Sequence, residues 1–229
     1  MPDTRDLALA RLLQLASPVL PVGAYSYSQG LEAAVEAGVV HDCASAGVWI
    51  GDALALSLAK FEAPAWWRMH AAWLAGDYSA VRDLDGWFRA TRETAELRAE
   101  TLQMGYSLRR LCVELGEFED APIAELQIME EVAFPTAFTF AVAQWGIPAR
   151  DALIAYLWSW LENQVMAALK AVPLGQTDGQ RLLVRLGAGL AMIADEAIAA
   201  DDSMLANFAP GLAIASCRHE TQYSRLFRS

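Results

Sequence analysis

Histidine and cysteine are the side chains of this sequence that could bind a transition metal, and they are few. The three histidines are His41, His70 and His219, and no two of them form an HxH or HExxH pattern. Cys217 and His219 lie two residues apart, and each can ligate nickel or zinc. On an extended segment both would face one side, whereas on a helix they would diverge. We take the pair as a weak metal candidate, which a symmetric dimer could double to four ligands; alternatively, Cys217 is a small buried apolar residue.

Motifs for enzymatic chemistry are missing from the sequence. It contains neither a GxxxxGKS or GxxxxGKT phosphate loop nor a GxSxG nucleophile elbow. A helical prenyl-transferring enzyme needs clustered aspartates to hold magnesium, but Asp201–Asp202 is a lone acidic pair at an expected helix end. We therefore expect no enzymatic activity and no stably bound cofactor.

The composition indicates a folded, acidic protein. Hydrophobic residues make up 55% of the 229 residues and charged residues only 20%, which excludes disorder for the chain as a whole. This apolar fraction indicates either a large core or an apolar surface kept for a partner. The formal net charge of -11 argues against nucleic acid as a partner, because phosphate binding needs clustered lysine and arginine.

Cysteine usage and hydropathy predict a cytoplasmic protein. Cys43, Cys112 and Cys217 are widely spaced and form no disulfide framework, as expected in a reducing compartment. The segment Met1–Leu20 carries charges and no long apolar run, so we do not expect a signal peptide. The longest charge-free stretch, Val132–Ala149, contains two prolines and a glycine, which predicts a buried helix and a turn rather than a membrane span.

Helix signals recur along the chain, and strand-like alternation is not convincing anywhere. Ser26 with Gln29 three residues later is a capping-box pattern, which predicts a helix over Tyr27–Ala37 that stops at Gly38. Asp42 is placed to cap the next helix.

The middle of the chain predicts two further helices. One is expected over Ala65–Ala75, and the pattern then stays helical over Ala80–Leu115, with Gly105 as a place where this long helix bends. Arg89–Glu93 and Arg92–Glu96 have the i,i+4 spacing of ion pairs on a solvated face.

Prolines and a second capping box divide the C-terminal half. Pro122 and Pro148 each suit the first turn of a helix. Thr177, three residues before a glutamine, predicts a helix over Asp178–Ala199, and a last short helix is expected over Ala206–Ala215. The sequence thus predicts a single all-α domain of about eight to ten helices.

Two segments are unusual. In Leu12–Glu32, two prolines and Gly23 lead directly into a helix start, which indicates an anion or partner site or, alternatively, an ordinary helix cap. The tail, Arg218–Ser229, mixes arginine with aromatic and aliphatic side chains, the composition of binding hot spots. Because Leu226 and Phe227 need cover, this tail either docks on a partner or packs on the body.

Four segments resemble the UreF family, in the same order and over nearly the whole chain: LPVGAYSYSQGLE (Leu20–Glu32), RETAELRAE (Arg92–Glu100), WLENQVMAALKAVPLGQTDGQR (Trp160–Arg181) and ASCRHETQYSRLFRS (Ala215–Ser229). The last run is highly specific. The sequence departs from the family at Ala24, where a second glycine is usual, and at Cys217, where alanine is common. Alanine tolerates positive φ poorly, so Ala24 restricts the turn after Gly23.

The resemblance implies an all-helical homodimer in one domain over 1–229, with an N-terminal arm and turn at 1–25 and a partner-docking tail at 216–229. It implies binding to the accessory protein UreD (UreH), recruitment of the GTPase UreG, and action on apo-urease during nickel incorporation. Nickel and GTP would then be handled by the assembled complex.

The resemblance also implies site residues. The tail residues expected to contact UreD (UreH) are Arg218, His219, Glu220, Gln222, Tyr223, Arg225, Leu226 and Arg228. The residues expected in partner or dimer contacts are Tyr25, Ser26, Ser28, Gln29, Glu32, Lys170, Gly175, Gln176 and Gln180.

Three other hypotheses compete with or extend this one. A nickel carrier would use Cys217 and His219. A GTPase-activating protein would insert Arg225 or Arg228 beside the transferred phosphate, which is compatible with the scaffold role. A helical lyase or transferase is disfavoured because clustered metal-binding carboxylates are missing.

Overall fold

The computed structural model describes residues 4–228, and across them the chain forms helices and no strands. The α-helices are α1 Thr4–Leu15, α2 Leu31–Glu36, α3 Cys43–Ala53, α4 Ala63–Ala75, α5 Tyr78–Ala90, α6 Ala95–Leu115, α7 Asp120–Ile128, α8 Phe134–Gln144, α9 Ala149–Ala171, α10 Gln176–Gly187, α11 Leu190–Ala199 and α12 Pro210–Glu220. Three further segments are the 3-10 turns η1 Ala24–Ser26 and η3 Asp202–Met204 and the π-helix η2 Leu54–Glu62.

Several of these segments are continuous. Helices α3 and α4 join through η2 without leaving right-handed helical dihedrals, and α10 and α11 are separated only by Ala188 and Gly189. Counting each of these as one helix gives ten helices within residues 4–228. The prediction of an all-α fold with about eight to ten helices is confirmed.

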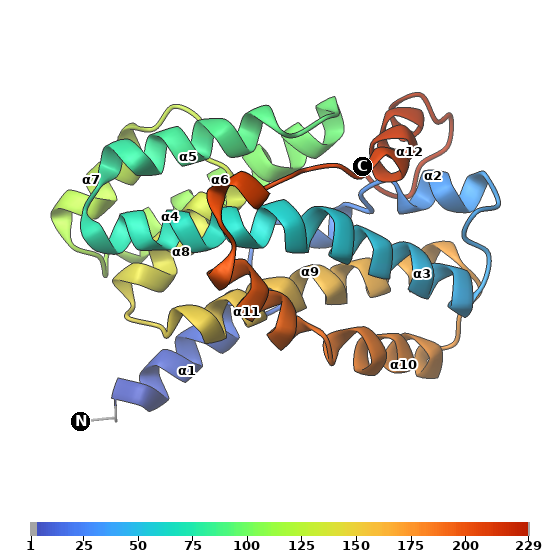
Figure 1. The fold of residues 1–229 in the computed structure, drawn as a ribbon, viewed down its shortest axis with the longest axis horizontal. Coiled ribbons are helices and arrows are strands. Elements are labelled where there is room, and N and C mark those ends of the chain that lie inside the picture. The colour runs from blue at the N-terminus through green and yellow to red at the C-terminus, as the bar shows by residue number, and fades with distance from the viewer. Residues whose placement is uncertain (1–3, 229) are drawn as a thin grey trace.

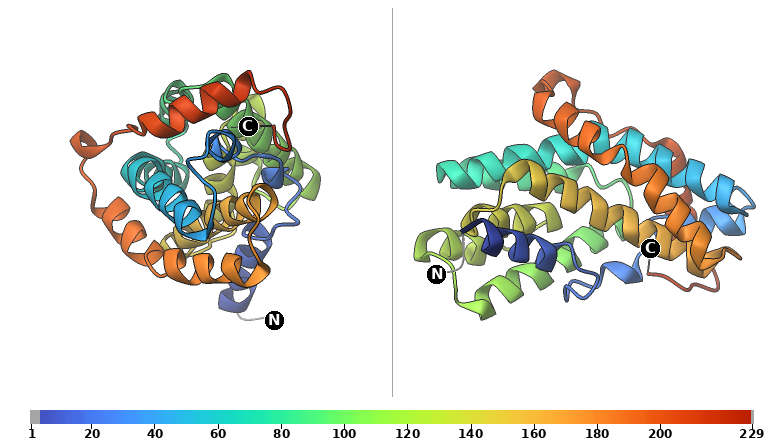
Figure 2. Two further views of the ribbon diagram at one scale, coloured as in Figure 1. Left: turned by 90° about the vertical axis from the view of Figure 1, so that its right-hand side faces the viewer. Right: turned by 90° about the horizontal axis from the view of Figure 1, so that it is seen from below.

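The α3–η2–α4 rod runs along the long axis of the molecule (Figure 1). Helix α8 lies in the core, with every residue of Pro135–Ala143 buried, and packs against α4 and α6. Its apolar residues on all faces explain this central position. Helices α2 and α12 pack together at one end of the rod, which the left view of Figure 2 shows from that end.

Local stop and start signals are confirmed. Asp42 caps α3, accepting a hydrogen bond from Ser45 N at 2.8 Å. Gly38, Gly76 and Gly146 take positive φ where helices end. Prolines also begin helices as expected, with Pro122 in the first turn of α7 and Pro148 directly before α9.

The expected long helix over Ala80–Leu115 is wrong in one place. The chain breaks between α5 and α6, where Thr94 has extended dihedrals and its side chain accepts from Leu97 N at 3.1 Å. This break removes the predicted Arg89–Glu93 and Arg92–Glu96 pairs. Instead, Arg89 pairs with Asp85 at 2.7 Å, and Arg92 pairs with Glu62 at 3.1 Å.

Gly105 lies inside the continuous helix α6, at a point of close approach. A Cβ at this position would lie 2.1 Å from the carbonyl oxygen of Val132, so only glycine lets α6 pack against the start of α8.

The boundaries of the C-terminal helices also differ from expectation. The Thr177 capping box does not form, because α10 already begins at Gln176. The last helix spans Pro210–Glu220 rather than Ala206–Ala215, with Pro210 in its first turn.

The predicted arm and tail both contain helix. Helix α1 occupies 4–15 of the arm predicted at 1–25, and residues 216–220 of the predicted tail belong to α12. Residues 1–3 and Ser229 of these predictions lie outside the described residues. Within 4–228, no helix is long and apolar enough to cross a membrane.

Candidate functional site

The N-terminal motif, Leu20–Glu32, meets the C-terminal tail and α9 at one surface. The ammonium group of Lys170, on α9, lies 5.9 Å from the ring centroid of Tyr25 and 5.5 Å from that of Phe227. Both distances lie within the range of cation–π contacts. Residues from three of the segments that resemble the UreF family therefore form one site.

The carboxylate of Glu32 holds the tail. Its Oε1 accepts a hydrogen bond from Leu226 N at 2.7 Å, and its Oε2 accepts from Phe227 N at 3.0 Å. The same Oε2 lies 3.1 Å from His219 Nε2. Glu32 is buried. A buried carboxylate needs such partners, because desolvation of an unpaired charge costs several kcal/mol.

A second carboxylate completes this cluster. Glu96, in the first turn of α6, lies 2.8 Å from His219 Nδ1 and 2.9 Å from Arg225 Nη1. Glu32 and Glu96 thus each lie against one ring nitrogen of the buried His219, and Glu96 also pairs with Arg225. We call Glu32, Glu96, His219, Arg225 and the amides of Leu226 and Phe227 the tail anchor.

Gly30 brings α12 close enough to form the tail anchor. Its φ is +79°, and a Cβ there would lie 2.9 Å from Ser216 N, so the backbones of the two segments nearly touch. The residue before it, Gln29, also has positive φ, at 52°. On α12, Ser216 Oγ pairs with Thr94 Oγ1 at 2.8 Å, which holds α12 against the start of α6.

The predicted capping box at Ser26 and Gln29 is wrong. Helix α2 begins at Leu31 after Gly30, whereas Ser26 belongs to the η1 turn. Gln29 instead bridges two other helices: it accepts from Trp160 Nε1 at 2.7 Å and donates to Glu100 at 2.8 Å. Tertiary contacts therefore use the amide that the local pattern assigned to a cap.

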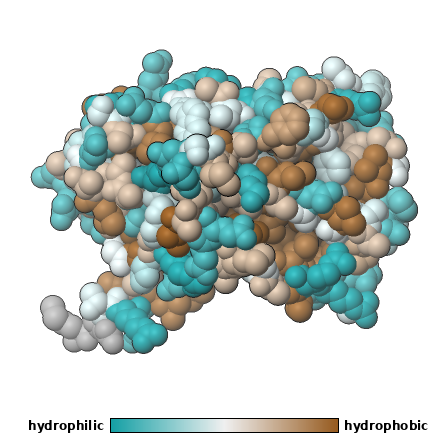
Figure 3. Space-filling view, in the orientation of Figure 1, coloured by the Kyte–Doolittle hydropathy of each residue, from teal (hydrophilic) through white to brown (hydrophobic). Residues whose placement is uncertain are grey.

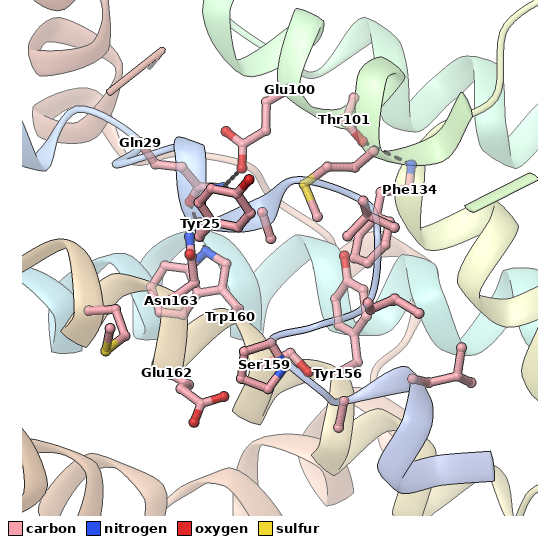
Figure 4. A pocket seen from close by; sticks show the side chains of 18 of the residues that line it. Tyr25, Gln29, Glu100, Thr101, Phe134, Tyr156, Ser159, Trp160, Glu162 and Asn163 are labelled. Carbon is pink, nitrogen blue, oxygen red and sulfur yellow. Dashed lines mark hydrogen bonds between the residues drawn. The ribbon is translucent and has the colours of Figure 1, made fainter. Parts of the chain in front are cut away.

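A cavity of ≈ 210 Å³ lies beside this bridge, between the N-terminal motif, α6, α8 and α9. Figure 4 shows Gln29, Tyr25 and Trp160 at one part of it and Phe134 and Tyr156 at another. Most of its wall is apolar, with a few polar groups, which suits a small molecule or a side chain. Glu162 lines it too, and burial raises the pKa of this carboxyl.

A buried polar cluster forms part of the cavity wall. Tyr156 Oη donates to Glu62, and Arg92 donates to the other oxygen of Glu62 at 3.1 Å. Burial first, and then the neighbouring Glu62 charge, raises the pKa of Tyr156 well above 10. The Arg92 guanidinium also stacks 4.1 Å from the Phe88 centroid. The phenol thus remains protonated near neutral pH and serves as a hydrogen-bond donor.

Cys217 and His219 do not share a side. Both lie on α12, where Cys217 is exposed and His219 is fully buried between two glutamates. The extended arrangement in which both would face one metal is therefore not formed. Among the described residues, no group of three or more histidine, cysteine, aspartate or glutamate side chains could hold a metal ion.

The tail residues predicted to bind a partner divide by exposure. His219 is buried and Gln222 is half-buried, whereas the exposed ones are Arg218, Glu220, Tyr223, Arg225, Leu226 and Arg228. Glu220 accepts from Ala95 N at 2.9 Å, at the positive end of α6. The tail therefore both packs on the body and displays side chains to solvent.

The other predicted residues divide in the same way. Tyr25 is exposed, Ser26 and Gln29 are half-buried, and Ser28 is buried with its Oγ accepting from Glu32 N at 3.4 Å. Lys170 reaches the site. In contrast, no hydrogen bond within residues 4–228 joins the tail to three exposed residues at the start of α10: Gly175, Gln176 and Gln180.

Sequence reasoning did not assign Glu96 or Phe227 to the site. Glu96 lies within RETAELRAE, the segment that resembles the family, but it was interpreted as one half of a surface ion pair. Phe227 is buried, and a large apolar ring within a charged tail is the signal that could have identified it.

Comparison with known proteins agrees with these motifs. The UreF family model matches residues 40–187. A urease accessory protein UreF from Azoarcus sp. (strain BH72) is 60% identical over 225 residues, covering 97% of this chain and 96% of the relative. Proteins of the same description from Dechloromonas aromatica (strain RCB) and Methylobacillus flagellatus are 56% and 49% identical, covering 97% and 99% of this chain and 98% and 100% of the relatives. The chain belongs to the UreF family of urease accessory proteins.

Proposed function

We propose that the protein is a non-enzymatic assembly factor for the maturation of urease by nickel incorporation. In this proposal it binds UreD (UreH), recruits the GTPase UreG and acts on apo-urease, and nickel and GTP are handled by the assembled complex. Family membership over nearly the whole chain supports the role in urease maturation. The named partners come from the resemblance of the motifs.

The exposed side of the tail is the observation that carries the scaffold role. Tyr223 is fully exposed, Leu226 is 72% exposed, and Arg225 lies beside them. Aromatic and arginine side chains dominate binding hot spots. Because the tail anchor already fixes the backbone, docking would cost less conformational entropy than ordering a free tail. This surface is our proposed contact with UreD.

Other exposed apolar side chains support a second contact. Figure 3 shows apolar residues over α3, α10 and α11, between hydrophilic ones. Val184 on α10 and Met192 on α11 are both exposed. On this basis we propose that the protein forms a homodimer. We also propose that it acts in the cytoplasm. We also include regulation of GTP hydrolysis, for which Arg225 and Arg228 are the candidate residues; both are exposed.

Substitution of the exposed tail side chains tests the scaffold role. The double variant Tyr223→Ala, Leu226→Ala should keep the fold and lose most UreD binding, because it removes the exposed apolar area without touching the tail anchor. The matched control is Tyr106→Ala, Leu74→Ala, which removes exposed apolar side chains outside both proposed contacts. Co-elution with UreD, then with UreG and apo-urease, and urease activity after addition of nickel and GTP are the measurements. Unchanged co-elution of the tail variant would overturn the assignment of this surface.

A further inference from the structure

Glu32 contacts two consecutive backbone amides of a segment almost two hundred residues further along the chain. The amides of Leu226 and Phe227 lie 2.7 and 3.0 Å from its two carboxylate oxygens. Each oxygen accepts one amide, so the carboxylate fixes the direction as well as the position of the tail backbone. Arg228 N donates to Ser26 O at 2.8 Å, which extends the contact by one residue.

This contact decides which side chains face outward. Residues 226 and 227 lie in a bend, which lets two consecutive amides point at the same carboxylate. Leu226 is 72% exposed, and Phe227 next to it is only 6% exposed. The two hydrogen bonds to Glu32 hold this bend in the orientation that keeps Leu226 outward and Phe227 inward.

The identity of the residue at position 32 is important for this geometry. Glutamine has one oxygen and one NH2 group, so one tail amide would face a donor instead of an acceptor. Aspartate is one methylene shorter and would draw both oxygens back from the amides. His219 Nε2, 3.1 Å from Oε2, and Glu96 behind it further restrict the rotamer of Glu32.

We propose that Glu32 is the positioning residue for partner docking: it holds the tail so that Tyr223 and Leu226 are presented outward, with Arg225 and Arg228 beside them. This rests on the proposed function. The partner surface that fits has an apolar pocket for Leu226 with carboxylates around it, because the presented edge is apolar in the middle and basic at its sides. Glu32 itself does not touch the partner.

The variant Glu32→Gln tests this role. In the isolated chain, the amides of Leu226 and Phe227 should exchange with solvent roughly tenfold faster or more, because one acceptor is lost. The affinity for UreD, measured by calorimetry, should fall about tenfold, because the tail must be ordered on docking. The control is Glu36→Gln, an exposed residue of α2 with the same change in charge, which should leave both measurements unchanged.

A semisynthetic chain keeps the test decisive if Glu32→Gln fails to fold. Cys217 allows a synthetic segment of residues 217–229 to be ligated to 1–216. An ester in place of the amide at Leu226 removes only the N–H that Glu32 Oε1 accepts, and should weaken UreD binding by several-fold. An ester at Tyr223, whose N–H does not contact Glu32, is the matched control and should bind as the all-amide chain does.

The outcomes separate the two proposals. If the wild-type chain binds UreD and both Glu32→Gln and the Leu226 ester bind equally well, the positioning role is overturned and the scaffold function stands. Amide exchange at wild-type rates in Glu32→Gln also overturns the positioning role. If the wild-type chain itself does not bind UreD, the scaffold function is overturned, and the positioning role with it.

Discussion

The tail anchor and the aromatic core both bury side chains, but they use opposite kinds of side chain. The tail anchor buries carboxylates, an imidazole ring and backbone amides, joined by hydrogen bonds of 2.7–3.1 Å. The aromatic core consists of Trp66, Phe134, Phe138 and Tyr156. Phe138 touches three of these rings, with centroid distances of 5.1, 5.7 and 6.3 Å.

This difference means that one set of residues stabilises the fold and another set controls the position of the tail. Burial of apolar area is non-directional and tolerates small shifts, so the aromatic core stabilises the helix bundle as a whole. Hydrogen bonds to a carboxylate depend on direction and partner, so a single atom change at Glu32 can release the tail while the bundle persists. Stability and presentation are therefore controlled by separate residues.

Substitution in the aromatic core should have the largest effect. Phe138→Ala removes a fully buried ring and should lower the free energy of unfolding by about 3–5 kcal/mol, because it loses apolar contacts and leaves a cavity. Urea denaturation is the measurement. The control Ile128→Ala, at an exposed position, should change the stability by no more than about 0.5 kcal/mol. If Phe138→Ala lowered the free energy of unfolding by less than about 1 kcal/mol more than Ile128→Ala does, a tightly packed core at this position would be contradicted.

The second effect concerns the packing of α12 against the N-terminal motif. Gly30→Ala should destabilise the protein by about 2–4 kcal/mol, because it adds strain at positive φ to a clash with Ser216 N. Gly38→Ala is the matched control: its φ is +72° but its surroundings are open, so only the strain of about 1–2 kcal/mol remains. Urea denaturation and exchange of the tail amides are the measurements. Equal effects of the two substitutions would show that the close approach of α12 adds nothing.

The local parts of the fold could be predicted because their causes are local. Asp42 caps α3 through the backbone N–H three residues on, and Gly38 and Gly76 end helices through their own positive φ. These signals act within a few residues and are legible in the sequence. The same reasoning was wrong at Ser26 and Gln29, where a contact with Trp160 on α9 takes the amide that a local cap would use.

The partners of charged residues could not be predicted, because they too depend on tertiary contacts rather than on neighbours in the sequence. Arg89 and Arg92 have glutamates four residues further on, but the helix breaks between them and they pair elsewhere. For the candidate site, the sequence predicts that the N-terminal motif and the tail each contact a partner. No sequence spacing indicates that Glu32 binds the backbone of Leu226. Long-range pairing depends on how the helices stack, which periodicity alone does not specify.

The smallest expected effect is a pH dependence of the stability that arises from His70, at the edge of the aromatic core. His70 is buried and stacks on Trp66, with ring centroids 5.6 Å apart, and burial lowers its pKa below 6.5. Because the folded state binds this proton less readily than the unfolded state, stability should fall as the pH drops below the ordinary histidine value of about 6.5.

His70→Phe should remove this part of the pH dependence, because phenylalanine keeps a ring beside Trp66 and does not titrate. The measurement is the urea midpoint at two values, about pH 7.5 and about pH 5.5, on either side of the ordinary histidine pKa. The wild type should lose more stability between them than His70→Phe does. His41→Gln, at an exposed position, is the control and should lose as much as the wild type. An equal loss in His70→Phe would mean that His70 does not contribute to the pH dependence of stability.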